Sequence, residues 1–401
     1  MYFLDKQHDD GFIQNFGDYM LETGAALWSL GEHYRYTRDD AWVKEISPKL
    51  LKSCDYLLRW RQRNQREELR GRGYGMLEGK TADPNDPFHS FMLNGYAYLG
   101  LSRVAEMLTK TEPTQSARLN KEAERLKDDI RSTFFSVMGS SPVVPLGDGT
   151  WCPTVPPWAE YRGPLALYAD GGKWYTHGSM VSRDSLLGPL YLAFQEVLGP
   201  EEPATTFLLS FHNELMTKRN AVFSQPYYSR HPIVHLRRGE VKPFLKAYYN
   251  TVASLADRQT YTFWEHYFGA SPHKTHEEGW FLMDTRWMLY MEKGDTLELL
   301  GGVPRNYLES GKRIELKNVA SYFGPVSLRV ESRLDEGRID ATVECPADRR
   351  PKTVELRLPH PLGRKPIWVK GGSYDPEKEM VRTALVGGRI EVSLGFSQGK
   401  E

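Results

Sequence analysis

Apolar residues recur at helical spacing through the first two thirds of the chain. Segment 21–36 spaces its large apolar residues three and four positions apart, and Asp39–Asp40 can cap the helix expected at 41–63. A second pair follows, in which 85–108 is apolar almost all round and 115–134 is more polar and charged. Buried helices that alternate with amphipathic ones are typical of an inner and an outer helical ring.

The stretch from about 136 to 180 loses this periodicity and is rich in Pro, Gly and Trp. So long an irregular segment is unusual inside a compact domain and is more often a binding loop or a lid. Beyond it the helical pattern resumes, and further helices are expected at 182–198, 203–217, 241–257 and 278–292.

Near Gly294 the pattern changes to short runs that alternate between apolar and polar residues. Seven such runs, from TLELL at 296–300 to RIEVSLGF at 389–396, are separated by turn residues. This pattern predicts an antiparallel β-sandwich. We therefore expect two domains, a helical one over 1–293 and a C-terminal β-sandwich over 294–401.

Composition excludes several classes of protein. The chain has 52 Lys+Arg and 52 Asp+Glu, so no overall field attracts nucleic acid or an acidic membrane. Its three cysteines form no CxxC pair, and no apolar stretch is long enough to span a membrane. The N-terminus has no signal peptide, which indicates a cytoplasmic protein if the chain is complete and a secreted or periplasmic one if a segment precedes it. The oligomeric state is left open.

The aromatic residues point to a sugar. Ten Trp and 22 Tyr outnumber 17 Phe, and many stand beside His, Asp or Glu in segments that read as loops. A ring face with a polar rim suits a saccharide, whose C–H faces pack on aromatics and whose hydroxyls need hydrogen-bond partners. The expected partner is thus a carbohydrate.

The densest group of candidate site residues lies in 260–287, TYTFWEHYFGASPHKTHEEGWFLMDTRW. A carboxylate beside tryptophans suits a general acid or base, so Glu265 is the catalytic candidate, with Trp264, His276 and Trp280 as substrate contacts. The structural alternative is an aromatic-capped helix start with a solvated first turn. Paired histidines occur here and at 231 and 235. Pro232 disfavours a helix at His231 and no HExxH motif occurs, so we expect no metal.

Three other segments add candidates. Glu78 lies between Leu77 and Gly79, outside any expected helix, and is the second catalytic candidate. Trp174 and His177, at the end of the long loop, are possible substrate contacts. Glu22 opens the first helix and is either a substrate ligand or a residue that favours the positive end of the helix dipole. No nucleotide-binding motif or hydrolase elbow occurs, and no cofactor is expected.

With these residues, the chain resembles the six-hairpin (α/α)6-barrel glycosidases, in particular family 78-type α-L-rhamnosidases. The likeness rests on the segment from Asp9 to Leu57, on TFWEHYFGASPHKTHEEGW, and on the sandwich beginning GGVPRNYLESGKRIELKNV. It implies that Glu265 is the general base of an inverting hydrolysis, that the following histidine is His276 or else His273, and that Glu22 binds substrate.

The chain also departs from this family. The family's acid-bearing Asp-Glu-Arg run is absent, and about eight expected helices fall short of the twelve in six hairpins. Either the loops hold further helices, or the toroid lacks its first part. The leading hypothesis is a glycoside hydrolase acting on a terminal sugar of a plant or microbial glycan. The alternatives are a non-catalytic carbohydrate-binding or scaffold protein and a polysaccharide lyase using Tyr161, Arg162 and His177.

Overall fold

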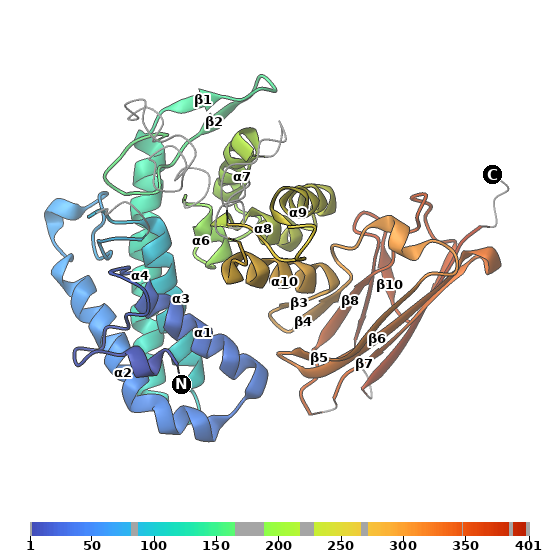
Figure 1. Cartoon of the computed structure of the whole chain (residues 1–401), viewed down its shortest axis with the longest axis horizontal. Helices are drawn as coiled ribbons and strands as arrows, with labels where there is room; N and C mark the ends of the chain where they lie inside the picture. Colours follow the sequence, from blue (N-terminus) through green and yellow to red (C-terminus); the bar gives the residue numbers. More distant parts are fainter. Residues whose placement is uncertain are drawn as a thin grey trace. The chain divides into compact units, whose positions relative to one another are not determined.

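A computed structural model describes residues 2–81, 87–164, 188–216, 228–265, 272–346, 348–384 and 388–397. Figure 1 traces a helical part followed by a β part along the chain. The helices are α1 (Glu22–Thr37), α2 (Asp40–Arg63), α3 (Phe91–Met107), α4 (Pro113–Ser140), α6 (Tyr191–Phe194), α7 (Pro203–Met216), α8 (His231–Arg237), α9 (Val241–Leu255) and α10 (Thr275–Leu289). A short hairpin of β1 (Val143–Pro145) and β2 (Trp151–Pro153) follows α4.

The chain divides into two compact units. The helical unit comprises 1–234 and 246–280, and the β unit comprises 235–245 and 281–401. The division passes through α8, α9 and α10, each of which begins in one unit and ends in the other. The change from helix to strand along the chain, at Leu289 and Tyr290, is therefore a different boundary from the division in space.

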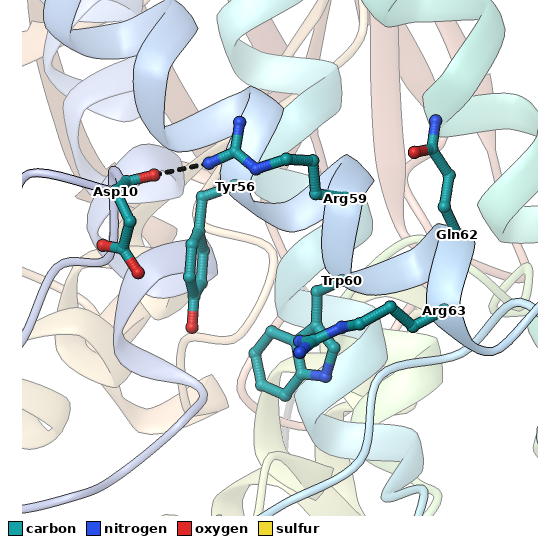
Figure 2. A pocket seen from close by; sticks show the side chains of 6 residues that line it. All are labelled: Asp10, Tyr56, Arg59, Trp60, Gln62 and Arg63. Atoms are coloured by element: carbon teal, nitrogen blue, oxygen red, sulfur yellow. Dashed lines mark hydrogen bonds between the residues drawn. The ribbon is translucent and has the colours of Figure 1, made fainter.

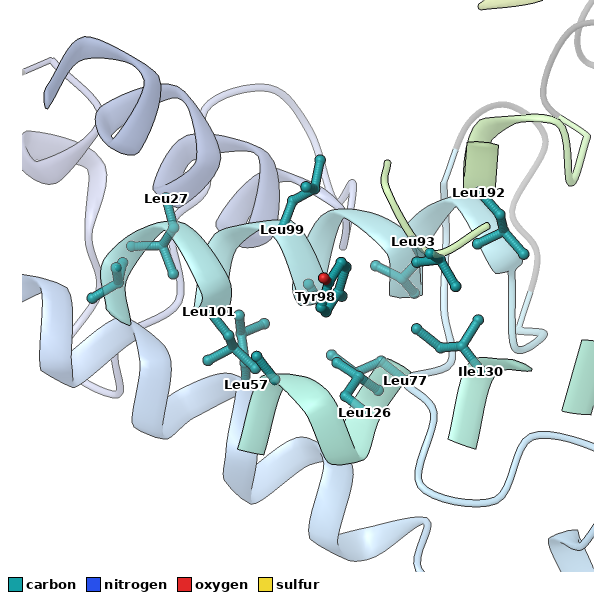
Figure 3. Packing of buried hydrophobic residues seen from close by; sticks show 14 of the residues in the cluster. Leu27, Leu57, Leu77, Leu93, Tyr98, Leu99, Leu101, Leu126, Ile130 and Leu192 are labelled. Atoms are coloured by element: carbon teal, nitrogen blue, oxygen red, sulfur yellow. The ribbon is translucent and has the colours of Figure 1, made fainter. Parts of the chain in front are cut away.

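The first four helices form in the predicted segments, but α3 begins at Phe91 instead of 85, with Ser90 as its N-cap, and α4 continues beyond 134 to Ser140. Asp39 caps α2 by accepting a hydrogen bond from the Trp42 backbone N–H at 2.9 Å, as its position predicts. Helix α3 is buried on nearly every side, which accounts for its continuous apolar sequence. Leucines of α1, α2 and α4 pack against it to form the core shown in Figure 3, including Leu27, Leu57 and Leu126.

Three helical predictions need correction. The described part of 182–198 contains only the short α6, while 165–187 lies outside the described residues. Helix α8 begins at His231, although Pro232 argued against a helix there, because proline is tolerated in a first turn, where its missing N–H would have no partner. Helix α10 ends at Leu289, because the next four residues pair as a strand.

The β unit holds two five-stranded sheets. One has the order β10-β11-β8-β4-β3 and the other β5-β6-β7-β12-β9. The strands are β3 (Tyr290–Lys293), β4 (Thr296–Leu299), β5 (Arg313–Ser321), β6 (Gly324–Arg333), β7 (Arg338–Glu344), β8 (Thr353–Arg357), β9 (Trp368–Lys370), β10 (Ser373–Asp375), β11 (Met380–Ala384) and β12 (Arg389–Gly395). All seven predicted runs form strands, and β3, β10 and β11 are further strands that the sequence pattern did not indicate.

Alternation along these strands sets which face is buried. In β6, Val326, Leu328 and Val330 are buried while the residues between them are more exposed. Neighbouring strands pair antiparallel, as predicted, except that β4 and β8 run parallel. The alternation thus identifies the strands, but the direction of pairing between strands distant in sequence is set by the connections between them.

All three cysteines are buried and unpaired. Burial raises the pKa of the Cys54 and Cys152 thiols, and it raises that of Cys345 to about 11. These thiols are protonated and unreactive at neutral pH.

Candidate functional site

His276 lies in the first turn of α10 between two aromatic side chains of the helical unit. Its ring stacks on Tyr228, with 4.5 Å between ring centroids, and its Nε2 atom accepts a hydrogen bond from Trp280 Nε1 at 3.0 Å. An indole nitrogen can only donate, so the proton of the neutral imidazole is on Nδ1. Burial is the main cause that lowers the pKa of His276 from 6.5, which keeps the ring neutral at pH 7.

Glu277 stands directly behind this ring. Its side chain is fully buried, and its Oε1 atom lies 3.3 Å from His276 Nδ1. Apart from this contact with His276, neither carboxylate oxygen has a hydrogen-bond partner among the described residues. A buried polar group without a partner is rare in folded proteins and is typical of functional sites.

Glu265 belongs to the same group of side chains. Its Oε2 atom pairs with Lys274 Nζ at 2.9 Å, and only 12% of the side chain is exposed. Burial raises the pKa of the Tyr228 hydroxyl, and the charges of Glu265 and Glu277 raise it further. Both carboxylates therefore act on Tyr228, which stands at the centre of the group. We call Tyr228, Glu265, Lys274, His276, Glu277 and Trp280 the Glu265 cluster.

A buried guanidinium borders the Glu265 cluster. Arg230 is 4% exposed, and its guanidinium carbon lies 3.4 Å from the centroid of the Trp280 ring. The rings of Tyr191 and Phe194 lie at 5.3 and 5.9 Å. Cation–π attraction strengthens when the cation is removed from water, so these rings stabilise the charge in the interior.

A buried hydrogen-bond chain connects the two sequence neighbours of Arg230. Ser229 Oγ lies 3.1 Å from His212 Nε2 and 2.9 Å from His231 Nδ1, and all three side chains are buried. This chain ties the residues on both sides of Arg230 to each other and to His212 in α7.

Two other sequence candidates, Trp264 and His273, are not part of the Glu265 cluster. Trp264 donates its backbone N–H to Leu255 O at 2.9 Å, and its side chain hydrogen-bonds the Asp257 carboxylate. Those bonds close the loop before Glu265 and give Trp264 a structural role. His273, the alternative to His276, is exposed and has a left-handed backbone with φ of 56°. Of these two histidines, His276 is the one in the Glu265 cluster.

Glu78 is held by two side chains from the end of α2. Its carboxylate accepts a hydrogen bond from Trp60 Nε1 at 2.9 Å and another from Asn64 Nδ2. Two residues further on, Lys80 lies over the ring of Tyr19, which in turn acts electrostatically on Tyr228. The segment that contains Glu78 and Lys80 is thus linked to the Glu265 cluster through Tyr19. Among the described residues, however, no hydrogen bond or ion pair joins Glu78 to Glu265.

Glu22 serves the loop that precedes α1. Its carboxylate accepts hydrogen bonds from the backbone N–H groups of Asn15 and Phe16, the latter at 2.9 Å. Burial raises the pKa of Glu22, and the two backbone bonds oppose that shift. These contacts support a structural role at the start of the helix. Trp174 and His177 lie outside the described residues.

No metal site is found in the described ranges, where no three His, Cys, Asp or Glu side chains are placed to hold an ion. Nor does any helix within those ranges have the length and apolar character needed to cross a membrane.

The comparisons with known proteins are sparse. No family model and no curated protein matches the sequence. The fold is similar to that of an α-L-rhamnosidase from Dictyoglumus thermophilum, with a TM-score of 0.48 and 11% sequence identity. That similarity covers 98% of this chain and 43% of the rhamnosidase chain. This distant likeness assigns neither a family nor a function.

Sequence reasoning did not select Glu277, Tyr228 or Arg230 for the site. The two glutamates after His276 read as a solvated first turn, yet Glu277 faces the interior. Tyr228 and Arg230 stand in an irregular segment before α8, where no periodicity indicates which side chains turn inward.

Proposed function

We propose that this protein is a glycoside hydrolase that acts on a terminal sugar of a plant or microbial glycan. The observation that supports the proposal is the Glu265 cluster, in which a largely buried carboxylate acts on Tyr228, whose ring stacks on a neutral imidazole next to a second carboxylate. Aromatic faces suit the C–H faces of a sugar, and the polar groups suit its hydroxyls.

In this proposal Glu265 is the general base that activates water. Inverting hydrolysis also needs an acid on the other side of the sugar, with roughly 6.5–9.5 Å between the two carboxyl groups. Glu78 is the sequence candidate for that acid, and its contacts with Trp60 and Asn64 leave its carboxylate fixed in orientation. His276 and Trp280 would contact the sugar.

Replacing Glu265 with glutamine tests the proposal. The Glu265→Gln protein should hydrolyse aryl glycosides at least about a hundredfold more slowly than the parent, because general base catalysis contributes roughly 10²–10⁴-fold. The matched control, Glu278→Gln, changes the neighbour of Glu277 and should keep the parental rate. Hydrolysis by Glu265→Gln at the parental rate would exclude Glu265 as the base.

A non-catalytic carbohydrate-binding protein is the second candidate. It is favoured by the ion pair of Glu265 with Lys274, which occupies one of the oxygens that would activate water. Calorimetry that detects oligosaccharide binding, with no product formed by the same protein, would establish this function instead.

A polysaccharide lyase receives less support. Arg162, which would bind a uronate in such an enzyme, donates hydrogen bonds to the backbone carbonyls of Ala159, Tyr161 and Gly71. These bonds give its guanidinium a structural task in the loop after β2.

A further inference from the structure

The last two turns of α2 border a hollow that no residue of the Glu265 cluster lines. It has a volume of about 550 Å³ and is lined by Asp10, Tyr56, Arg59, Trp60, Gln62 and Arg63. This volume falls within the roughly 300–1,000 Å³ of pockets that hold small ligands. We call it the α2 groove.

Helical spacing gathers the groove's aromatic and cationic side chains. Tyr56, Trp60 and Arg63 stand four and three positions apart, so they project from one face of α2. Figure 2 shows these three side chains extending from successive turns to the same side of the helix. The rings of Tyr56 and Trp60 meet edge to face, with 5.9 Å between their centroids. Trp60 is only 2% exposed and supports the Tyr56 ring from behind, so the groove combines one partly exposed aromatic ring, that of Tyr56, with the cation of Arg63.

Several polar groups of the groove have unused hydrogen-bonding capacity. Among the described residues, the Arg63 guanidinium, the Tyr56 hydroxyl and the Gln62 side-chain amide have no hydrogen-bond partner, and Arg63 also has no ion pair. Arg59 uses one N–H to donate to the Asp10 backbone carbonyl at 2.6 Å, also seen in Figure 2. An empty saccharide site typically has polar groups without a protein partner next to the face of an aromatic ring.

The guanidinium of Arg63 favours an acidic sugar over a neutral one. Among the lining residues Arg59 and Arg63 bring two positive charges and Asp10 one negative charge. Glu78, which is bonded to Trp60, adds a negative charge near Tyr56. The Asp10 carboxylate is engaged in its own loop, where it accepts the Phe12 backbone N–H at 3.0 Å. A planar guanidinium binds a carboxylate through two parallel hydrogen bonds, which a neutral hydroxyl cannot match.

We propose that the α2 groove is a binding site for a carboxylated saccharide, with the sugar ring on Tyr56 and its carboxylate on Arg63. Gln62 and the Tyr56 hydroxyl would bind ring hydroxyls, and Arg59 would strengthen the positive potential. Burial raises the pKa of Tyr56, so its hydroxyl is a proton donor at neutral pH.

Isothermal titration calorimetry on the full chain, in 20 mM salt, tests this site with trigalacturonic acid as probe and uncharged maltotriose as comparison. The acidic trisaccharide should bind at least about tenfold more tightly than maltotriose, and raising the salt concentration should weaken its binding. Arg63→Gln should weaken trigalacturonate binding at least about tenfold, because it removes the charge and the fork of donors but keeps an exposed polar side chain.

Two control proteins make the result specific. Arg66→Gln removes the same charge three positions away, outside the groove, and should bind trigalacturonate like the parent. Glu265→Gln should also bind it unchanged, since the groove shares no residue with the Glu265 cluster. Loss of binding in Glu265→Gln with normal binding in Arg63→Gln would overturn the proposal. So would equal affinity for the two trisaccharides, or for trigalacturonate and the small carboxylate acetate.

Discussion

Glu277 places a carboxylate in the interior of the helical unit, where its one polar contact among the described residues is His276 Nδ1, 3.3 Å from Oε1. Burying a polar group in this way costs free energy, and proteins keep such groups mostly where a ligand or a reaction uses them. The adjoining His276 is half-buried and neutral, and it accepts a hydrogen bond from Trp280. The local environment is therefore better suited to a function than to stability.

The substitution Glu277→Gln should separate the effect of this carboxylate on function from its effect on stability. A neutral amide of similar shape costs less to bury than a carboxylate, so the free energy of unfolding should rise by about 1 kcal/mol. Sugar binding at the Glu265 cluster should fall about tenfold, because the partner of His276 has changed. Urea unfolding and calorimetry measure the two quantities, with Glu278→Gln as the control. A loss of stability in Glu277→Gln would show that the carboxylate is bonded and structural.

The lowered pKa of His276 predicts a dependence of stability on pH. The unfolded chain binds a proton near pH 6.5, whereas the folded imidazole does so only at lower pH. This contribution is therefore constant above pH 6.5 and is lost as the pH falls through 6.5 toward the folded pKa. His276→Gln cannot be protonated, so its free energy of unfolding should decrease less between pH 7.5 and pH 5 than that of the parent. Parallel curves from urea titrations at both pH values would contradict the assignment.

The sequence could predict part of this site. His276 and Trp280 are four positions apart, and helical spacing places them together on α10. Tyr228 and Arg230 come from a segment distant in sequence, and they meet α10 only through the tertiary fold. No local rule gives such a contact, which is why these two residues were missed.

At the scale of elements, the close approach of α1 and α3 depends on glycine. A Cβ at Gly24 would lie 2.7 Å from backbone atoms of Tyr96 and Ala97, and a Cβ at Gly100 would lie 2.8 Å from the Gly24 carbonyl oxygen. These are backbone atoms, which cannot turn aside as a flexible side chain could. The two helices can therefore lie this close only with glycine at these positions.

Gly24→Ala should accordingly reduce the free energy of unfolding by about 1–3 kcal/mol, the range for overpacking a close-packed interior. The matched control is Gly139→Ala near the end of α4, where a Cβ meets nothing within 4 Å. There alanine should leave stability unchanged or raise it by up to about 1 kcal/mol, because alanine favours the helix. Thermal and urea unfolding of both proteins measure the difference, and equal stabilities would contradict the predicted clash.

Most elements were predictable because their cause is local. Spacing of apolar residues identified α1 and α2 and all seven predicted strands, and Asp39 marked the start of α2. Strand β3 was predicted as helix because its four residues follow α10 directly and show no turn before them. These residues form a strand because they pair with β4, and residues paired in a sheet cannot continue the helix.

At the scale of the whole molecule, the change in sequence pattern and the division into two compact units give different domain boundaries. The sequence pattern changes near Gly294, but the β unit also includes 281–293 and 235–245. Leu236, Phe244 and Met288 all lie within van der Waals reach of a Cβ placed on Gly302, so these residues pack on the β unit. Sequence pattern could not show this, because these residues belong to helices whose other ends lie in the helical unit.

Two fragments of the chain test this division. A fragment of residues 281–401 keeps β3 and Met288, while 294–401 loses β3 and leaves β4 without its partner at the sheet edge. The longer fragment should therefore unfold at a higher urea concentration and with a steeper transition. Circular dichroism during urea titration makes the comparison. Identical curves would place β3 outside the cooperative unit.

The three buried, protonated thiols have a practical consequence. Because Cys54, Cys152 and Cys345 are shielded, a new exposed cysteine would react with a maleimide dye much faster than they do. Gln62→Cys, at the rim of the α2 groove, would carry such a dye without removal of any native cysteine. Its emission would then report directly when the groove is filled.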